Sequence, residues 1–316
     1  MVAPMTHRIL LTDGKLWCLA LAVLAGCGGG SSQAPTLDAA STQDQDAAPA
    51  MAADAAPPST NTCTDGGVAT SGCTSKPVLA SVTDLSGTWV LETIGAQLVK
   101  VPAYQPFHIK SVSVMLAKVE QTGDVVTLTG QYCDRIQQDD PKNPAKVVIP
   151  DAWRLTPTAF QRSGTFAPDE AGVTTLVLPS YVEVFGASLT DPACEILPVD
   201  PSDPRMIDVD DDGYPGLSVQ LTGLIPGALR SVQRQSTALT GVAVAENRIE
   251  GGMVYLSDQS VVDSAPDSIK ALYAASTAFA DPGVCASSFV MIKLPDDAGP
   301  VDCEYVRANE NPLFGL

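Results

Sequence analysis

The sequence predicts an all-β fold, either an antiparallel barrel or a sandwich, with one short helix near the C-terminus. Two observations predict it. Segments in which apolar and polar residues alternate recur between residues 87 and 307, and short turn-forming stretches separate them. Alternation is the pattern of a strand with one buried face, and many such strands joined by short turns form a barrel or two packed sheets.

Residues 1–26 have the layout of an export signal. His7, Arg8 and Lys15 precede an apolar run from Leu16 to Leu24. A run of this length is too short to span a bilayer as a helix, which takes roughly 20 residues, but it is typical of the core of a secretory signal. We therefore expect these residues to be absent from the mature protein.

The signal ends in Leu24-Ala25-Gly26-Cys27, which resembles the lipobox of bacterial lipoproteins. The resemblance implies cleavage before Cys27, a diacylglyceryl group on its thiol and an acyl chain such as palmitate on the new amino terminus. Two or more chains anchor a protein stably, whereas one does not. Gly28, in place of a retaining Asp, implies the cell outer membrane, with the rest of the chain periplasmic or surface-exposed. The alternative is an ordinary secretory signal, or a short anchor helix, with a chance cysteine.

Residues 27–77 are predicted to be a disordered tether that carries one small cysteine loop. The segment is rich in Ala, Asp, Pro, Ser and Thr and has almost no large apolar residue, a composition that cannot bury a core. A flexible chain of about 50 residues spans roughly 40 Å. The remainder, residues 78–316, is long enough for a single β-rich globular domain.

The strands of this domain are predicted from alternation and from the turns between them. Residues 121–124 predict a hairpin turn between the second and third strands. The predicted strands cover residues 87–94, 111–120, 125–132, 173–178, 217–221, 229–237, 240–245, 248–256, 288–294 and 302–307.

One helix is predicted from about residue 266 to 278. Asp267 or Ser264 would cap it, and an apolar stripe follows the helical period. The stripe consists of Ile269, Leu272, Tyr273 and Ala275.

The start of the first strand, Ser86-Gly87-Thr88-Trp89, resembles the Gly-x-Trp opening of lipocalins and other calycin barrels. The resemblance covers four residues. It implies a lipocalin-like barrel in which Gly87 permits a tight turn into the strand and Trp89 plugs the closed end. The simpler interpretation is a β-strand with a tryptophan in the core.

The acidic loop at residues 208–216 predicts a calcium site. Its Asp208, Asp210 and Asp212 alternate and are followed by Gly213, so the three carboxylates can converge on one hard cation. The backbone carbonyl of Tyr214 would be a further ligand. The pattern resembles the calcium loops of EF-hands, dockerins and thrombospondin type 3 repeats.

The surroundings of the acidic loop argue for a structural ion rather than a sensor. Val219 stands where an EF-hand has Glu, and the flanks are strand-like, so the loop is not an EF-hand. Asp200, Asp203 or water would supply the missing ligand. The alternative is a solvated acidic turn without metal.

Six cysteines remain when Cys18 leaves with the signal and Cys27 carries lipid. An even number in an exported chain predicts three disulfides, although six cysteines allow fifteen connectivities. We favour two pairs that close short loops and assign the third by elimination. The predicted pairs are Cys63–Cys73, Cys285–Cys303 and Cys133–Cys194.

Composition argues against a nucleic-acid partner, because the formal net charge is −18 and such a field repels phosphates. It offers little for catalysis either. His108 is the one histidine outside the signal, and no nucleophile, metallopeptidase or phosphate-loop motif is present.

We therefore expect a membrane-anchored, non-enzymatic domain that binds a small ligand or a partner protein, or forms part of the surface, with calcium as a structural ion. The alternative is a hydrolase of envelope or extracellular polymers that uses carboxylates far apart in sequence. A deep pocket with convergent carboxylates would favour the hydrolase.

Overall fold

A computed structural model of the protein describes residues 72–79, 82–138, 140–297 and 299–314. The predicted signal, Cys27, Cys63 and all of the predicted tether before residue 72 lie outside the described residues. Within them, none of the helices has the length and apolar character needed to cross a membrane.

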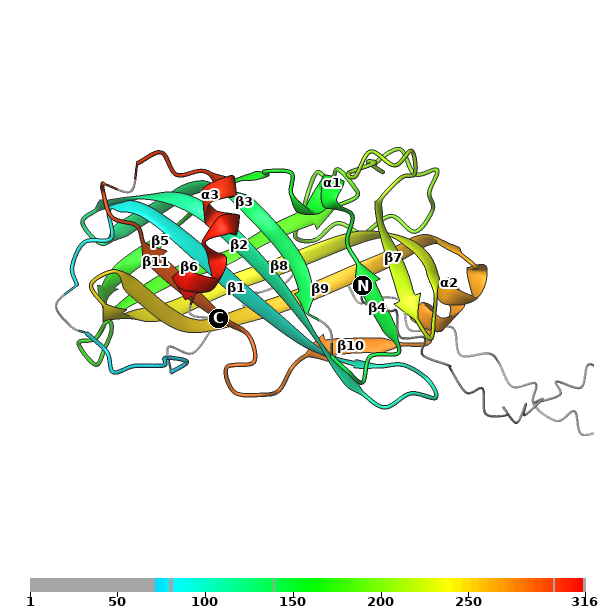
Figure 1. Ribbon diagram of the computed structural model, residues 1–316, viewed down its shortest axis with the longest axis horizontal. Helices are drawn as coiled ribbons and strands as arrows, with labels where there is room; N and C mark the ends of the chain where they lie inside the picture. The colour runs from blue at the N-terminus through cyan, green and yellow to red at the C-terminus, as the bar shows by residue number, and fades with distance from the viewer. Residues whose placement is uncertain (1–71, 80–81, 139, 298, 315–316) are drawn as a thin grey trace, which may run out of the picture. The chain divides into compact units, whose positions relative to one another are not determined.

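Eight antiparallel strands form a closed ring in which each strand pairs with its neighbours along the chain. The last of them, β11, pairs with β1 and closes the barrel (Figure 1). The predicted all-β class is confirmed, and the ring closure makes the architecture a barrel. The ring consists of β1 (Gly87–Lys100), β2 (Phe107–Thr122), β3 (Val125–Gln138), β5 (Ala159–Pro168), β6 (Thr174–Phe185), β8 (Gly227–Ala245), β9 (Arg248–Ala265) and β11 (Ser288–Lys293).

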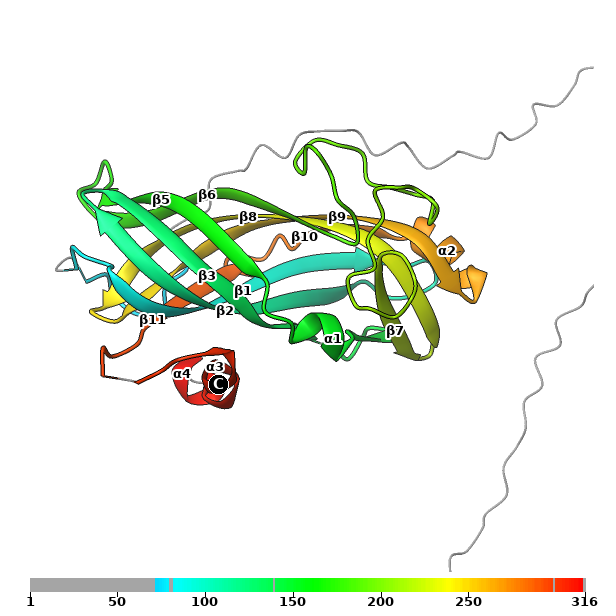
Figure 2. The ribbon, with the colours of Figure 1, turned by 90° about the horizontal axis from the view of Figure 1, so that it is seen from above.

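The remaining elements extend one end of the barrel or cover its outside. The short strand β7 pairs with the first residues of β8, β4 pairs with β7, and β10 pairs with the last residues of β1. Two helices, α3 and α4, lie outside the wall (Figure 2) and contact β2, β3 and β11. The elements outside the ring are β4 (Ala145–Val148), α1 (Asp151–Arg154), β7 (Leu217–Gly223), α2 (Asp267–Ala274), β10 (Thr277–Ala280), α3 (Cys303–Ala308) and α4 (Glu310–Phe314).

The interior of the barrel is packed with apolar side chains at the end where the β2–β3, β5–β6 and β8–β9 hairpins lie. Trp89 is 1% exposed there, and its indole N–H donates to the carbonyl of Leu85 at 2.7 Å. Large side chains from other strands complete the cluster, among them Leu128, Phe166 and Phe289. Each fully buried side chain of this size contributes about 1.5–3 kcal/mol, so this end is the main apolar core.

Most predicted strands are confirmed, and the structure differs from the prediction in three respects. Residues 229–237 and 240–245 form one continuous strand, β8. The predicted strand at 302–307 is wrong: these residues form α3, because the Asp302 side chain caps the helix by accepting the N–H of Tyr305 at 2.8 Å. Strands β4 and β5 were not predicted.

The predicted helix at 266–278 is confirmed but shorter, since α2 ends at Ala274 and residues 277–280 form β10. Neither proposed residue caps it, because the N-cap position is Pro266 and makes no side-chain cap hydrogen bond; the Ser264 hydroxyl accepts the N–H of Lys270 at 3.1 Å. Ile269 is the buried member of the apolar stripe.

The predicted disulfide pairs are wrong. The structure joins Cys73 to Cys285 and Cys133 to Cys303, with sequence separations of 212 and 170 residues. Cys194 is also disulfide-bonded. Short loops close most easily in an unfolded chain, but here the folded barrel brings distant segments together. The bonds attach the N-terminal segment to the loop before β11, and α3 to β3.

Candidate ligand cavity and acidic loop

The half of the barrel opposite the packed end contains a cavity of about 570 Å³. Its mouth lies among β4, β7, β10 and α2, and the packed apolar core lies beyond its inner end. The mouth is lined mainly by apolar side chains: Val99, Phe107, Ile109, Val147, Leu221 and Leu272. The deeper lining is polar: Gln97, Ser111, Ser113, Arg135, Gln137, Gln235 and Ser257.

Strand β2 shows how the sequence produces this gradient. Its inward positions read Phe107, Ile109, Ser111 and Ser113 from the mouth toward the interior, and Met115 then belongs to the packed core. The polar stretch therefore lies between two apolar regions. The short side chains of Ser111 and Ser113 do not fill the middle of the barrel, so a cavity remains beside them.

Arg135 is the one cationic side chain among the described residues that line the cavity. It is 4% exposed, and its guanidinium carbon lies 4.0 Å from the ring centre of Tyr132 and 4.9 Å from that of Trp153. In such contacts, the electron-rich face of the aromatic ring attracts the cation. All three guanidinium nitrogens nevertheless lack a hydrogen-bond partner. Burial lowers the pKa of Arg135, and the negative charge of nearby Glu183 opposes that shift.

A β-bulge at Cys133 turns Arg135 toward the interior. Tyr132 pairs with Met115 and Asp134 with Val114, so Cys133 is the extra residue on β3. The bulge reverses the alternation beyond it, so that Arg135 faces inward opposite Ser113. Without the extra residue, Arg135 would face outward.

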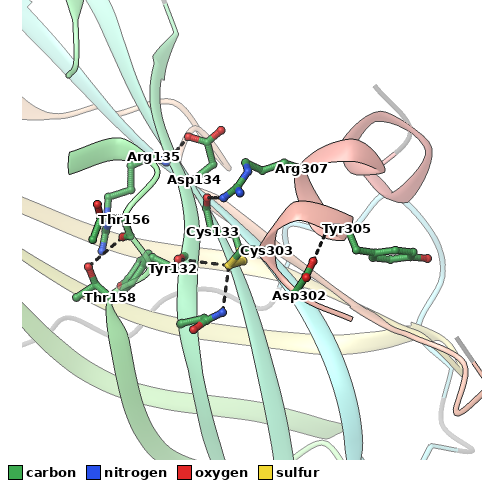
Figure 3. Close-up of a disulfide and its surroundings, with 11 residues drawn as sticks. Tyr132, Cys133, Asp134, Arg135, Thr156, Thr158, Asp302, Cys303, Tyr305 and Arg307 are labelled. Atoms are coloured by element: carbon green, nitrogen blue, oxygen red, sulfur yellow. Dashed lines mark hydrogen bonds between the residues drawn. A yellow bond between two sulfur atoms is a disulfide. The ribbon is translucent and has the colours of Figure 1, made fainter. Parts of the chain in front are cut away.

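The outside of the bulge is attached to α3. The Cys133–Cys303 disulfide joins the two elements, and Arg307 of α3 donates to the carbonyl of Cys133 at 2.8 Å. Figure 3 shows Cys303 and Arg307 on one side of β3 and the Arg135 side chain on the other. The covalent attachment therefore fixes the segment of β3 that orients the buried cation.

A second, smaller hollow of about 380 Å³ lies where the barrel wall is incomplete. Strand β5 pairs with β6 only through residues 165–168, so the last residues of β6 lack a strand neighbour on that side. Glu183 lines this hollow, and its carboxylate accepts a hydrogen bond from the Tyr132 hydroxyl. Burial raises the pKa of Glu183 and raises that of Tyr132 well above its usual value.

The acidic loop brings together the three carboxylates predicted to bind calcium. Carboxylate oxygens of Asp208, Asp210 and Asp212 lie within 4.8 Å of one another. Asp210 is 5% exposed; its Oδ2 accepts the N–H of Ser218 at 3.2 Å, and its Oδ1 has no partner. Burial, opposed by the Ser218 N–H and reinforced by the neighbouring aspartates, raises the pKa of Asp210 to about 6.

Of the other groups predicted as calcium ligands, Asp203 is engaged elsewhere. Asp203 forms an ion pair with Arg205 at 2.7 Å, so its carboxylate is already paired. The N–H of Tyr214 donates to Asp212 at 2.8 Å, and its ring lies 3.6 Å from the guanidinium carbon of Arg230. Asp208 accepts the N–H of Gly213 at 2.8 Å, so the backbone holds the carboxylates together.

His108 lies outside the cavity. Its side chain is 48% exposed and pairs with Asp281 at 2.6 Å. Neither the cavity nor the role of Arg135 could be predicted from the sequence, because the bulge that orients Arg135 leaves no trace in an alternation pattern. Comparisons of the chain with protein-family models, curated proteins and solved structures found no match.

Proposed function

We propose that this protein is a membrane-anchored binding protein that holds a small, mainly apolar ligand in its barrel. The observation that carries the proposal is the cavity of about 570 Å³ with an apolar mouth and a polar interior. Ligand sites in proteins are typically clefts of about 300–1,000 Å³ with few polar groups that fix orientation. The Gly87-Thr88-Trp89 resemblance to lipocalins is in keeping with this function.

The cavity lining favours binding over the hydrolase alternative. Asp258 is the one acidic side chain among the described lining residues, and it pairs with Arg234 at 2.7 Å. Glycoside hydrolysis requires two carboxyl groups about 5–9.5 Å apart across the bond that is cleaved. The described lining does not supply such a pair.

The binding function is tested by filling the cavity. Ser113→Trp places a large ring among the deeper lining residues, whereas Lys110→Trp adds the same ring to the exposed face of β2. A neutral environment-sensitive probe, N-phenyl-1-naphthylamine, is titrated into each protein. We expect saturable binding to the wild type and to Lys110→Trp, with at least a ten-fold loss in Ser113→Trp. Absence of binding to the wild type, or equal binding to all three proteins, would refute the proposal.

We also propose that the acidic loop holds a structural calcium ion. Calcium takes six to eight oxygen ligands, and the unpartnered Oδ1 of buried Asp210 beside Asp208 and Asp212 is an acceptor that a cation would satisfy. Calorimetric unfolding with calcium and with a chelator tests this site, and an unchanged melting temperature would count against it.

The membrane attachment is proposed from the lipobox resemblance alone. Cys27 would carry the lipid, with the barrel tethered in the cell envelope at the outer membrane. Mass spectrometry of the mature N-terminal peptide should find acyl chains on Cys27. An unlipidated product would remove this part of the proposal and leave the cavity argument unaffected.

A further inference from the structure

We infer that the ligand of the cavity is an amphipathic molecule with a single carboxylate, which Arg135 and Gln137 bind while its apolar chain extends toward the mouth. The inference rests on the proposed binding function and deepens it by naming the chemical class of the ligand.

The first argument is the unsatisfied cation. Arginine has five N–H donors in one plane, and removing such a charge from water is unfavourable unless it is paired and hydrogen-bonded. The rings of Tyr132, Trp153 and Phe185 lie near the guanidinium carbon, at 4.0, 4.9 and 5.6 Å. Aromatic faces leave the N–H donors without acceptors, and none of the three nitrogens has a partner.

The other buried arginines do not share this condition. Arg162, which also lies inside the barrel, donates to the carbonyls of Pro179 and Thr237 at 3.1 and 3.0 Å. Arg234 pairs with Asp258 at 2.7 Å. Arg135 therefore differs from Arg162 and Arg234, because terminal nitrogens of those two side chains have hydrogen-bond partners and those of Arg135 have none.

A second unpartnered donor lies beside Arg135 on the same strand. Gln137 follows Arg135 by two residues on β3, lines the same cavity, and has a buried side-chain Nε2 without a hydrogen-bond partner. Arg135 and Gln137 face inward opposite Ser113 and Ser111 of β2. Two adjacent unpartnered donors on one face of a strand would be satisfied together by one planar anion.

Charge balance selects a monoanion. Glu183 lies close enough to two buried cations, Arg135 and Arg162, to raise the pKa of each against the effect of burial, so this group carries one positive charge more than Glu183 balances. A carboxylate brings one negative charge and matches the fork of the guanidinium. A phosphate monoester brings ≈ −1.5 to −2 at neutral pH, and the excess charge would be buried without a partner. The apolar mouth around Phe107, Ile109 and Leu221 then receives an alkyl chain.

The test compares an acid with its neutral ester. The probes are 11-(dansylamino)undecanoic acid and its methyl ester, titrated into the wild type, Arg135→Gln and Lys110→Gln. Lys110 is an exposed cation on the outer face of β2, so Lys110→Gln removes one positive charge without touching the lining. Charged hydrogen bonds contribute enough for about a ten-fold or greater preference.

We expect the wild type and Lys110→Gln to bind the acid at least ten-fold more tightly than the ester. In Arg135→Gln the two probes should bind equally, with ester affinity retained. Equal binding of both probes to the wild type, or a preference that survives in Arg135→Gln, overturns the inference while the proposed function stands. Binding of neither probe overturns both.

Two further measurements complete the test. If Arg135→Gln does not fold, Gln137→Leu keeps the cation and removes the second donor. It should reduce the acid-to-ester preference several-fold, and an unchanged preference in that variant counts against the inference. Dodecyl phosphate and dodecanoate compete with the acid probe, and displacement by the phosphate at equal or lower concentration would overturn the assignment of a carboxylate.

Discussion

The Cys133–Cys303 disulfide offers a prediction whose size follows from the structure. The double variant Cys133→Ala/Cys303→Ala removes a cross-link between residues 170 positions apart. Chain entropy alone assigns such a loop about 5 kcal/mol of stabilisation. The Cys73–Cys285 bond encloses much of the same chain and already restricts the unfolded state. We therefore expect the variant to lose about 2–4 kcal/mol.

Urea unfolding followed by tryptophan fluorescence measures this loss. Trp89 reports on the packed end of the barrel and Trp153 on the cavity, and both should show one shifted transition. A control variant, Val306→Ala, keeps the disulfide but removes apolar contact between α3 and the wall, and should cost about 1–3 kcal/mol. A loss below about 1 kcal/mol in the double variant would refute the view that this bond is a main stabiliser of the barrel.

Three further outcomes follow from the structure. Asp210→Asn should abolish the calcium-dependent rise in melting temperature. The control Asp211→Asn, in the same loop but outside the carboxylate cluster, should retain that rise. Equal behaviour of the two variants in calorimetry would contradict the calcium site. Trp89→Ala removes a fully buried ring and should lower the unfolding free energy by about 3–5 kcal/mol in urea titration; a small loss would mean that this end is not the core. His108→Ala breaks the pair between a half-exposed imidazole and Asp281, whose carboxylate still accepts the N–H of Gly283, and should change stability by less than about 1 kcal/mol. A larger effect in the same assay would show that the pair contributes more than a surface ion pair.

The strands that could be predicted contain a stretch of regular alternation with apolar inward side chains, such as Met115, Ala117 and Val119 of β2. In β5, by contrast, the inward positions are Phe160, Arg162, Gly164 and Phe166. An arginine and a glycine in the middle of this series interrupt the alternation, so the strand escaped prediction. The arginine is tolerated because carbonyls of β6 and β8 accept its N–H groups, a fact of tertiary structure.

Of the candidate sites, one could be predicted from the sequence and the other could not. The acidic loop could be predicted, because its three aspartates are close in sequence and a short turn brings their carboxylates together. The cavity could not, because its lining comes from strands spread over the whole barrel. Arg135 was further concealed by the bulge at Cys133, which exchanges the inner and outer faces of β3 beyond that point.

The attachment of residues 72–79 has a mechanical consequence. Cys73 is bonded to Cys285, and the N–H of Leu79 donates to the carbonyl of Ala243 at 2.7 Å. A pulling force applied from the N-terminal side therefore reaches the loop before β11 directly through the Cys73–Cys285 bond. The segment that leads from Cys73 to Trp89 lies inside this covalent loop and cannot be peeled away from its N-terminal end alone. A load applied from the N-terminal side would therefore act on the loop before β11 before it could act on the segment that leads into β1.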